Sequence, residues 1–202
     1  TSRAHPWHGI SPGKEAPEQI MTFIEMVPTD TVKYELDKVS GHLMVDRPQK
    51  YSSMVPAPYG FIPKSYCDQK VAGLAAEASG RREVQGDKDP LDILVLTERA
   101  INQGGIIARA RPVGGLRLFD GNEADDKILS VMLSDSLFGD VATLDELPTG
   151  LVERIRHYFL TYKELPPRSG EQFQQPKIEI TETYGRDAAY KVINAAFADY
   201  SD

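Results

Sequence analysis

The sequence predicts one α+β domain, in which a small closed β-barrel comes first and helices pack outside it. Segments with a period of two, or short apolar runs, fill most of the chain between residues 20 and 133. The two longest segments with helical spacing lie in the last third, beyond residue 149. No linker and no internal repeat divides the 202 residues, so we expect a single domain spanning 1–202.

The elements follow in chain order. Residues 1–17 carry Pro and Gly without periodicity and predict a surface arm, in which His5 and His8 are interpreted as packed or solvated rather than as metal ligands. The predicted strands are residues 20–27, 32–37, 42–47, 93–96, 106–113, 115–119 and 127–133. The second and third of these strands form a hairpin through the turn at Ser40-Gly41.

Four further segments complete the predicted domain. The proline-rich residues 55–63 predict an extended, bent segment. Residues 70–85 combine alanines, glycines and charges and are interpreted as a surface insertion with room for a short helix. Helices are predicted at 150–165, where Pro166-Pro167 ends the first, and at 187–200.

Composition limits the class of function. The formal net charge of −7 argues against a protein that binds the nucleic-acid phosphate backbone. The single cysteine, Cys67, rules out an internal disulfide framework and is typical of a reducing cytoplasm. No apolar run approaches the length of a membrane span. We therefore expect a cytoplasmic protein with no nucleic-acid partner and no membrane partner.

The acidic stretch from Asp87 to Asp92 precedes the apolar run of residues 93–96. Unpaired carboxylates at the mouth of a buried strand are costly, so Asp87, Asp89 and Asp92 together indicate a hard cation. A solvated acidic turn explains the stretch equally well, and a DxD sugar-nucleotide site is a weaker alternative. An EF-hand is excluded, because Asp92 stands where that loop requires glycine.

A second acidic turn covers residues 120–126. Taken alone it predicts a solvated β-turn. Glu25 adds to the acidic groups, since it lies between apolar residues on a predicted inner strand. Lys33, Glu35 and Asp37 share one face of their strand, where an exposed polar face is the ordinary interpretation.

With these motifs in order, the chain resembles the family I soluble inorganic pyrophosphatases from about Gln19 to Tyr200. The segment Asp87-Lys88-Asp89-Pro90-Leu91-Asp92-Ile93 matches the family pattern D-x-D-P-x-D followed by an aliphatic residue. Seven companion segments occur in the family's order: Ile24-Glu25, residues 33–37, Val45-Asp46-Arg47, residues 59–62, residues 111–114, residues 120–127 and Tyr162-Lys163.

The resemblance implies a role for each matching residue. It implies that Asp87, Asp92, Asp120 and Asp125 bind Mg²⁺, and that Glu25 and Glu35 hold metal-bound water or a further ion. Asp89 is implied as the general base or as the group that orients the attacking water. The groups implied to grip the two phosphates are Lys33, Arg47, Tyr59, Lys127, Tyr162 and Lys163.

The implied activity is Mg²⁺-dependent hydrolysis of inorganic pyrophosphate to two phosphates by in-line attack of a metal-activated water. Dense oxygen anions match Mg²⁺, Arg and Lys, which supports the list independently of the family. Mn²⁺ or Zn²⁺ could replace Mg²⁺, because carboxylate oxygens accept all three. The resemblance also implies a homo-oligomer, with a hexamer and a dimer both open.

The chain departs from the family pattern at two positions. Lys88 occupies a position where the family has a small or acidic residue, and strand alternation directs its side chain outward. Val55 stands where the family commonly has a second tyrosine, so one hydroxyl contact is missing. The role of Arg168 is left open.

Three other functions remain in competition. The predicted OB-like barrel could bind single-stranded nucleic acid, although that function needs a basic, aromatic groove. A metal-dependent phosphatase acting on organic phosphoesters or nucleotides would use the same residues. A catalytically silent scaffold is the third, and Val55 and Lys88 are the features that favour it.

Overall fold

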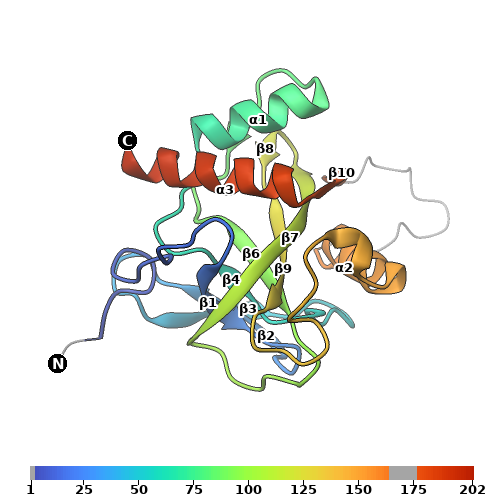
Figure 1. Cartoon of the computed structure of the whole chain (residues 1–202). Coiled ribbons are helices and arrows are strands. Elements are labelled where there is room, and N and C mark those ends of the chain that lie inside the picture. Colours follow the sequence, from blue (N-terminus) through green and yellow to red (C-terminus); the bar gives the residue numbers. More distant parts are fainter. Residues whose placement is uncertain (1–2, 164–176) are drawn as a thin grey trace.

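The computed structural model describes residues 3–163 and 177–202. The strands are β1 (Ile20–Met26), β2 (Val32–Leu36), β3 (Leu43–Pro48), β4 (Tyr59–Phe61), β5 (Gln85–Gly86), β6 (Asp92–Leu96), β7 (Ile106–Asp120), β8 (Glu123–Ala124), β9 (Lys127–Met132) and β10 (Ile178–Gly185). The helices are α1 (Gln69–Ser79), η1 (Leu144–Glu146), α2 (Thr149–Thr161) and α3 (Arg186–Ser201). Figure 1 shows strands at the centre of the molecule and helices outside them, which confirms the predicted class.

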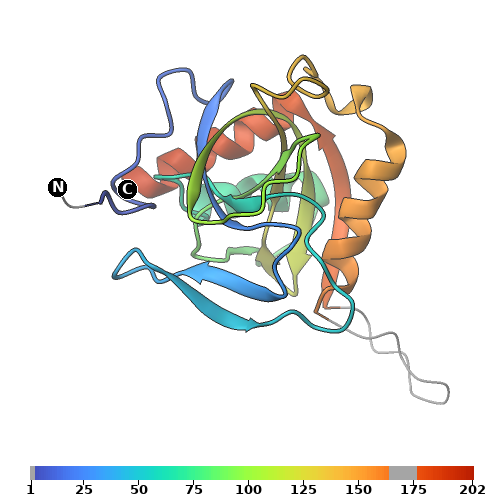
Figure 2. The same ribbon diagram turned by 90° about the horizontal axis from the view of Figure 1, so that it is seen from below.

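Five strands close into a ring. β1 pairs with both β4 and β7, and the path β4-β6-β9-β7 joins those two partners. The pairs are antiparallel except β6 with β9, which run parallel and bring Asp92 opposite Lys127. Figure 2, seen from below, shows the closed outline of these strands. In a closed ring each of these strands has a neighbour on both sides. The loops that connect the strands therefore meet at the two open ends of the barrel.

The predicted strands at 106–113 and 115–119 form one strand, so that prediction was wrong. β7 runs without a break for 15 residues and pairs with β1, β8, β9 and β10 along its length. Its register with β9 shifts between Pro112 and Gly114. Because proline has no N–H to donate, the ladder is interrupted there, and a bulge bends the strand without ending it.

β10 was not predicted. Its sequence alternates isoleucine with glutamate and threonine, and it pairs with the second half of β7. The strand lies between the two long helices in the chain, where no helix or strand was expected. An edge strand that is polar on one face gives a weak apolar signal, and its existence depends on β7 as a partner.

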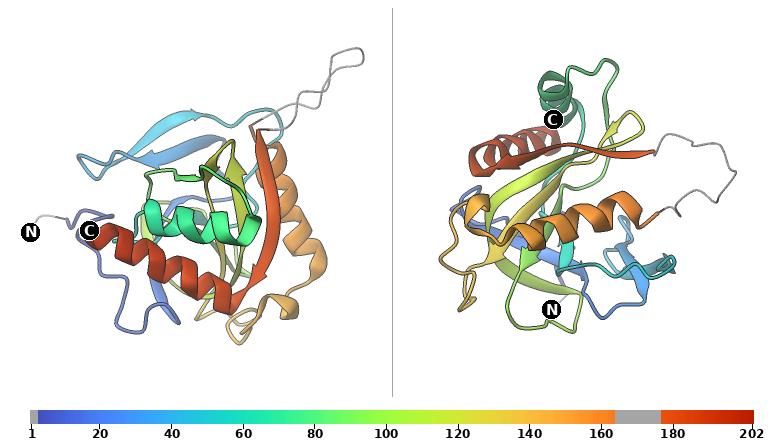
Figure 3. Two further views of the ribbon diagram at one scale, coloured as in Figure 1. Left: turned by 90° about the horizontal axis from the view of Figure 1, so that it is seen from above. Right: turned by 90° about the vertical axis from the view of Figure 1, so that its right-hand side faces the viewer.

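The hairpin of β2 and β3 forms a separate two-stranded sheet, as predicted. α1, which lies within the segment interpreted as an insertion, packs side by side with α3 at one end of the barrel (Figure 3). α2 lies on the flank beside β10. α2 and α3 match the predicted helices to within a few residues, and the predicted stop at Pro166-Pro167 lies outside the described residues.

The N-terminal arm packs on the fold. Trp7 is buried and its indole donates a hydrogen bond to the carbonyl oxygen of Ser65. His8 shares a 2.8 Å hydrogen bond with the hydroxyl of Tyr200, which places the arm beside the C-terminal end of α3 (Figure 2). No helix in the described part of the chain has the length and apolar character needed to cross a membrane.

Candidate active site

A cavity of about 220 Å³ opens where β2, α2, the turn before β6 and the turn after β7 meet. The predicted site residues that line it are Glu25, Lys33, Glu35, Tyr59, Asp87, Asp89, Asp92, Asp120, Asp125, Lys127, Tyr162 and Lys163. Segments far apart in the sequence therefore converge on one space. The polar face of β2 is a wall of this cavity rather than a free surface.

Arg47 is the predicted site residue that does not line the cavity. It pairs with Lys33 across the β2-β3 ladder, and its guanidinium donates to Asp46 at 2.6 Å. The same Asp46 carboxylate lies 3.2 Å from the Lys33 ammonium. Arg47 and Lys33 thus share the Asp46 carboxylate, which holds Arg47 beside the cavity.

Four acidic side chains and one lysine form the centre of the cavity. Asp92 opens β6 and lies opposite Lys127 of β9, whose buried ammonium contacts both Asp92 and Asp125. The Tyr59 hydroxyl donates to Asp92 at 2.5 Å. Burial disfavours the charged form of Lys127, but Asp125 and Asp92 outweigh it and raise the pKa of Lys127 well above its usual value.

The remaining acids of this centre hold protons in the absence of a cation. Burial, followed by repulsion from Asp125 and Asp92, raises the pKa of Asp87 to about 9. Burial and then Asp92 raise the pKa of Glu25 to about 8, although the Leu36 backbone N–H donates to this carboxylate at 2.7 Å. Carboxyl groups crowded so that they cannot all ionise match a site for added positive charge.

The donor set fits a divalent cation. Hard cations such as Mg²⁺ take oxygen ligands, and the groups available here are carboxylates with room for water. Within residues 3–163 and 177–202, no three acidic, histidine or cysteine side chains are already grouped closely enough to hold an ion. The Lys127 ammonium lies between Asp92 and Asp125 and neutralises them. The case for a divalent cation therefore rests on the oxygen donors that line the cavity. For a cation to bind Asp92 and Asp125, the Lys127 ammonium would have to leave them.

Asp120 lies at the end of β7 on another side of the cavity. Its carboxylate is 2.7 Å from the Lys163 ammonium and 2.9 Å from that of Lys177. Burial opposes ionisation of Asp120, but the two lysines outweigh it and hold its pKa below the usual range. Asp120 is therefore charged across the neutral pH range, unlike Asp87.

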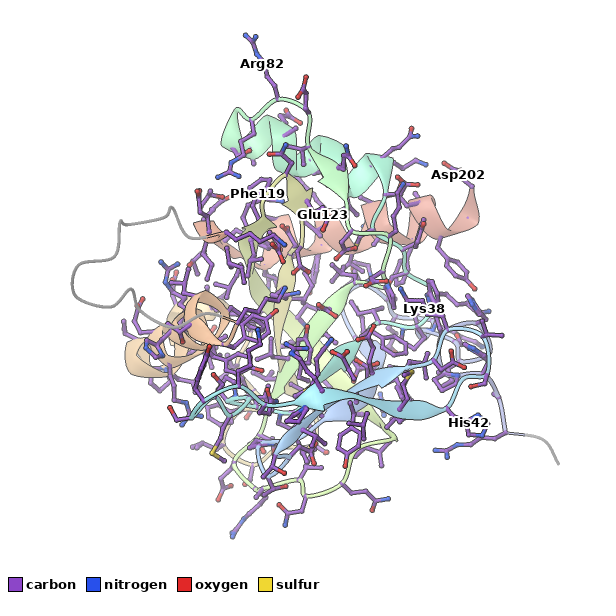
Figure 4. All side chains as sticks on the ribbon, turned by 180° about the vertical axis from the view of Figure 1, so that it is seen from behind. Lys38, His42, Arg82, Phe119, Glu123 and Asp202 are labelled. Atoms are coloured by element: carbon purple, nitrogen blue, oxygen red, sulfur yellow. The ribbon has the colours of Figure 1, made fainter. Side chains whose placement is uncertain are left out.

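Asp89 occupies the mouth of the cavity, and its side chain is 42% exposed. Its backbone N–H donates to the Asp87 carboxylate at 3.0 Å, and its own carboxylate pairs with Lys38. Figure 4 shows Lys38 extending from the β2-β3 hairpin. Lys88 points away from the cavity and pairs with Asp68, in agreement with the predicted outward direction.

Four polar residues that line the cavity were missed: Lys38, Gln49, Glu123 and Tyr158. Tyr158 had a usable signal, because it precedes Tyr162 by one helical turn and faces the same way. Lys38 directly follows the polar face of β2. Gln49 had no signal, since its position depends on how the chain leaves β3.

Comparison with known proteins places the whole chain in one group. The profile described as inorganic pyrophosphatase matches residues 22–201. An inorganic pyrophosphatase of Chlamydia trachomatis is 47% identical over 199 residues, covering 98% of this chain and 95% of that protein. The soluble inorganic pyrophosphatase PPA1 of Solanum tuberosum is 33% identical, covering 90% of this chain and 82% of that protein. The crystal structure of the Thermus thermophilus inorganic pyrophosphatase has a TM-score of 0.79 and 28% identity, covering 98% and 100% of the two chains.

Proposed function

This chain belongs to the inorganic pyrophosphatase family, metal-dependent enzymes that hydrolyse pyrophosphate to two phosphates, and we propose that the cavity described above is its active site. The observation that carries the proposal is the meeting of Asp87, Asp92, Asp120 and Asp125 in one cavity with four lysines. In this proposal the resident metal is Mg²⁺, held by these four carboxylates, with Glu25 and Glu35 holding bound water or a further ion. When bound, such ions supply Lewis-acid polarisation of phosphoryl oxygens and a more acidic water.

The protein's own groups bind and orient the substrate. Lys33, Lys127 and Lys163 offer ammonium donors to the phosphoryl oxygens, and Tyr59 and Tyr162 offer hydroxyl donors. These groups stabilise the negative charge that develops on the leaving phosphate. Arg47 joins them in the proposal if substrate draws its guanidinium from Asp46. Each lysine exchanges a carboxylate for a phosphate when metal and substrate enter.

Asp89 is proposed as the residue that orients the attacking water and accepts its proton. It is the carboxylate of the group that lies at the mouth of the cavity, where it can reach the water from the outer side. A positioned carboxylate of this kind contributes about 10²–10⁴-fold to a proton-transfer step. Lys38 contacts Oδ1 of Asp89, which leaves Oδ2 available to accept the proton.

The test is phosphate release from pyrophosphate with and without Mg²⁺, with ATP and p-nitrophenyl phosphate as alternative substrates. We expect release from pyrophosphate only with a divalent ion, and release from the organic substrates at least about a hundredfold slower. Equal rates for all three would instead support the phosphatase hypothesis. Repeating the assay with Mn²⁺ and Zn²⁺ ranks the metals.

The Asp92→Asn variant tests the site itself. Removing this charge should reduce turnover by at least about a hundredfold, because it disrupts both the proposed metal site and the Lys127 contact. Circular dichroism should show an intact fold. Asp145→Asn, on the surface at η1, is the matched control and should keep full activity. Full activity in Asp92→Asn would refute the assignment.

We also propose that the protein is cytoplasmic and forms a homo-oligomer. A cytoplasmic location is supported by a single cysteine, Cys67, which is buried and unpaired. A homo-oligomer is supported by exposed apolar side chains that include Met44, Val45 and Tyr51. Sedimentation would decide between a hexamer and a dimer.

A further inference from the structure

Two uncharged polar side chains, Gln49 and Tyr158, line the cavity among its lysines and carboxylates. Neither belongs to the set assigned above. They come from different parts of the chain, since Gln49 follows β3 and Tyr158 lies on α2. Their shared position raises the question of what they bind there.

The Gln49 amide is a buried donor without a partner. Its Nε2 atom is inaccessible to solvent and has no hydrogen-bond partner among the described residues. The backbone N–H of Gln49 donates to the Thr31 carbonyl oxygen at 3.0 Å, so the residue is anchored beside the start of β2. A buried unsatisfied donor is destabilising, and its presence in a cavity indicates a ligand that accepts the hydrogen bond.

Tyr158 is held rigidly. Its ring stacks on Tyr162 with 5.1 Å between ring centroids and meets Phe159 edge-on at 5.1 Å. The residue is only 9% exposed, and its ring belongs to the apolar cluster that includes Val55. With the ring packed in this way, the hydroxyl is the part of the side chain that can serve the cavity.

The surroundings of the Tyr158 hydroxyl favour donation to an anion. Burial, followed by the neighbouring Tyr162, raises the pKa of Tyr158 to about 12, while the adjacent Gln49 side chain, Arg47 and Lys33 act in the opposite direction. The phenol therefore stays protonated in neutral solution. The Gln49 amide lies beside the Tyr158 hydroxyl, although the two do not meet the geometry of a hydrogen bond. Two cationic groups and one amide face it, which is the environment of a phosphoryl oxygen.

We propose that the Tyr158 hydroxyl and the Gln49 amide bind the same phosphoryl group of pyrophosphate as Lys33. Gln49 Nε2 and the phenol both donate hydrogen bonds, and phosphoryl oxygens accept them. The proposal rests on the function proposed above and deepens it.

Val55 provides a reason for this contact. Its side chain carries no polar atom, lies 1% exposed and does not line the cavity, so it cannot supply the hydroxyl that the family resemblance leads us to expect there. Val55 and Tyr158 pack in the same apolar cluster. α2 can therefore deliver a hydroxyl to the region that the 55–63 segment leaves apolar.

The test uses Tyr158→Phe and Gln49→Met, which remove the polar atoms and keep the volume. We expect the affinity for inorganic phosphate, titrated by calorimetry with Mg²⁺ present, to fall about ten- to a hundredfold, as for a hydrogen bond to a charged group. KM for pyrophosphate should rise in parallel, with kcat changed less than threefold. Tm should stay within about 2 °C of the parent protein, because the packing is unchanged.

Tyr34→Phe is the matched control, since Tyr34 packs against the same cluster without lining the cavity. Parent-like phosphate affinity and KM in both single variants would overturn the inference, as would equal losses in the Tyr34→Phe control. A parent protein inactive on pyrophosphate would refute the proposed function, and the phosphate titration would still decide this inference.

Discussion

At the scale of single residues, the cavity is a set of exchangeable ion pairs. The pairs are Lys33 with Glu35, Lys38 with Asp89, Lys127 with Asp92 and Asp125, and Lys163 with Asp120. A buried charge without a partner costs several kcal/mol, so a site that binds both metal and anion must neutralise itself when empty. The ion pairs between these acids and lysines neutralise charge in the empty site.

Asp126 shows that adjacent acids can have unrelated roles. Asp125 and Lys127 face the cavity, whereas Asp126 is fully buried elsewhere and accepts hydrogen bonds from Arg117 at 2.8 Å and from the Tyr184 hydroxyl at 2.9 Å. Arg117 also lies over the Tyr184 ring, 4.9 Å from its centroid. The ion pair joins β7 to the residue that precedes β9, and the Tyr184 hydroxyl links β10 to the same carboxylate.

The Asp126 ion pair gives a stability prediction. Asp126→Ala should lower the free energy of unfolding by about 3 kcal/mol, because it removes the buried partner of Arg117 and leaves that guanidinium only the more exposed Glu182 carboxylate, 3.6 Å away. Tyr184→Phe should cost about 1 kcal/mol, since only one hydrogen bond is lost. Urea unfolding measures both. The double variant Arg117→Met with Asp126→Leu should be more stable than Asp126→Ala, and equal losses in the two single variants would contradict this account.

At the scale of elements, α1 is capped by another helix. The Asp199 carboxylate on α3 accepts hydrogen bonds from the backbone N–H groups of Asp68, Lys70 and Val71. The first N–H groups of a helix have no partner within it, and the side chain of the N-cap residue, Asp68, makes no cap hydrogen bond. The segment from 70 to 85 is thereby attached to the C-terminal helix rather than to the cavity.

Asp199→Ala should loosen α1 selectively. We expect a loss of about 1–2 kcal/mol, the usual effect of removing a helix cap, and faster hydrogen exchange in α1. Pyrophosphate hydrolysis should be unchanged, since Asp199 does not line the cavity. Asp202→Ala is the matched control, because its pair with Lys70 is exposed. Loss of activity without loss of stability would show that α1 shapes the site.

Asp135 joins the loops that follow β6 and β9, and its contribution depends on pH. Its carboxylate accepts hydrogen bonds from the Thr97 hydroxyl and from the backbone N–H groups of Glu98, Leu137 and Phe138. Burial opposes ionisation, but these donors outweigh it and lower the pKa to about 2. A carboxyl group with a lowered pKa stabilises the fold above its unfolded pKa of about 3.9, and that stability is lost as the pH falls toward 2.

Asp135→Asn should therefore lower Tm by about 2–4 °C at pH 7, which corresponds to about 1 kcal/mol for this partly exposed group. The difference from the parent protein should shrink as the pH falls from 5 toward 2. Thermal unfolding at several pH values measures it. A difference that is constant across this range would mean that packing, not charge, explains the effect.

At the scale of the whole molecule, the closed ring decides where the site forms. The turn before β6, the turn after β7 and the strand β2 reach the same cavity because the five-stranded ring brings their ends together. Concentrated acids make the ion-free fold less stable, since Asp87 and Glu25 must hold protons there. Ion binding should therefore stabilise the entire fold through linkage.

Mg²⁺ should raise Tm. At about a hundred times the dissociation constant, linkage contributes about 2.7 kcal/mol, which corresponds to a rise of about 5–10 °C for a chain of this size. Thermal unfolding in millimolar MgCl₂, against NaCl of equal ionic strength, measures it. Asp92→Asn should show a smaller rise. No rise in the parent protein would count against a site with several ions.

The sequence alone predicted the fold class, α2, α3 and the β2-β3 hairpin. Through the family resemblance it also predicted the polar residues that line the cavity, apart from Lys38, Gln49, Glu123 and Tyr158. The elements could be predicted because apolar periodicity reflects which face of a helix or strand is buried. The site residues could be predicted because the acidic motifs match the family pattern. The sequence did not predict the continuous β7 or the existence of β10, since a bulged strand and a polar edge strand exist only through their partners.

Only the tertiary structure decided how the charges are paired. It separated Asp126 from Asp125, placed Lys127 between two carboxylates and brought Gln49 and Tyr158 into the cavity. The physical reason is that a side chain's partner depends on distances across the closed ring, where residues remote in sequence meet. Local patterns indicate which residues carry charge, and the closure of the barrel decides which charges meet.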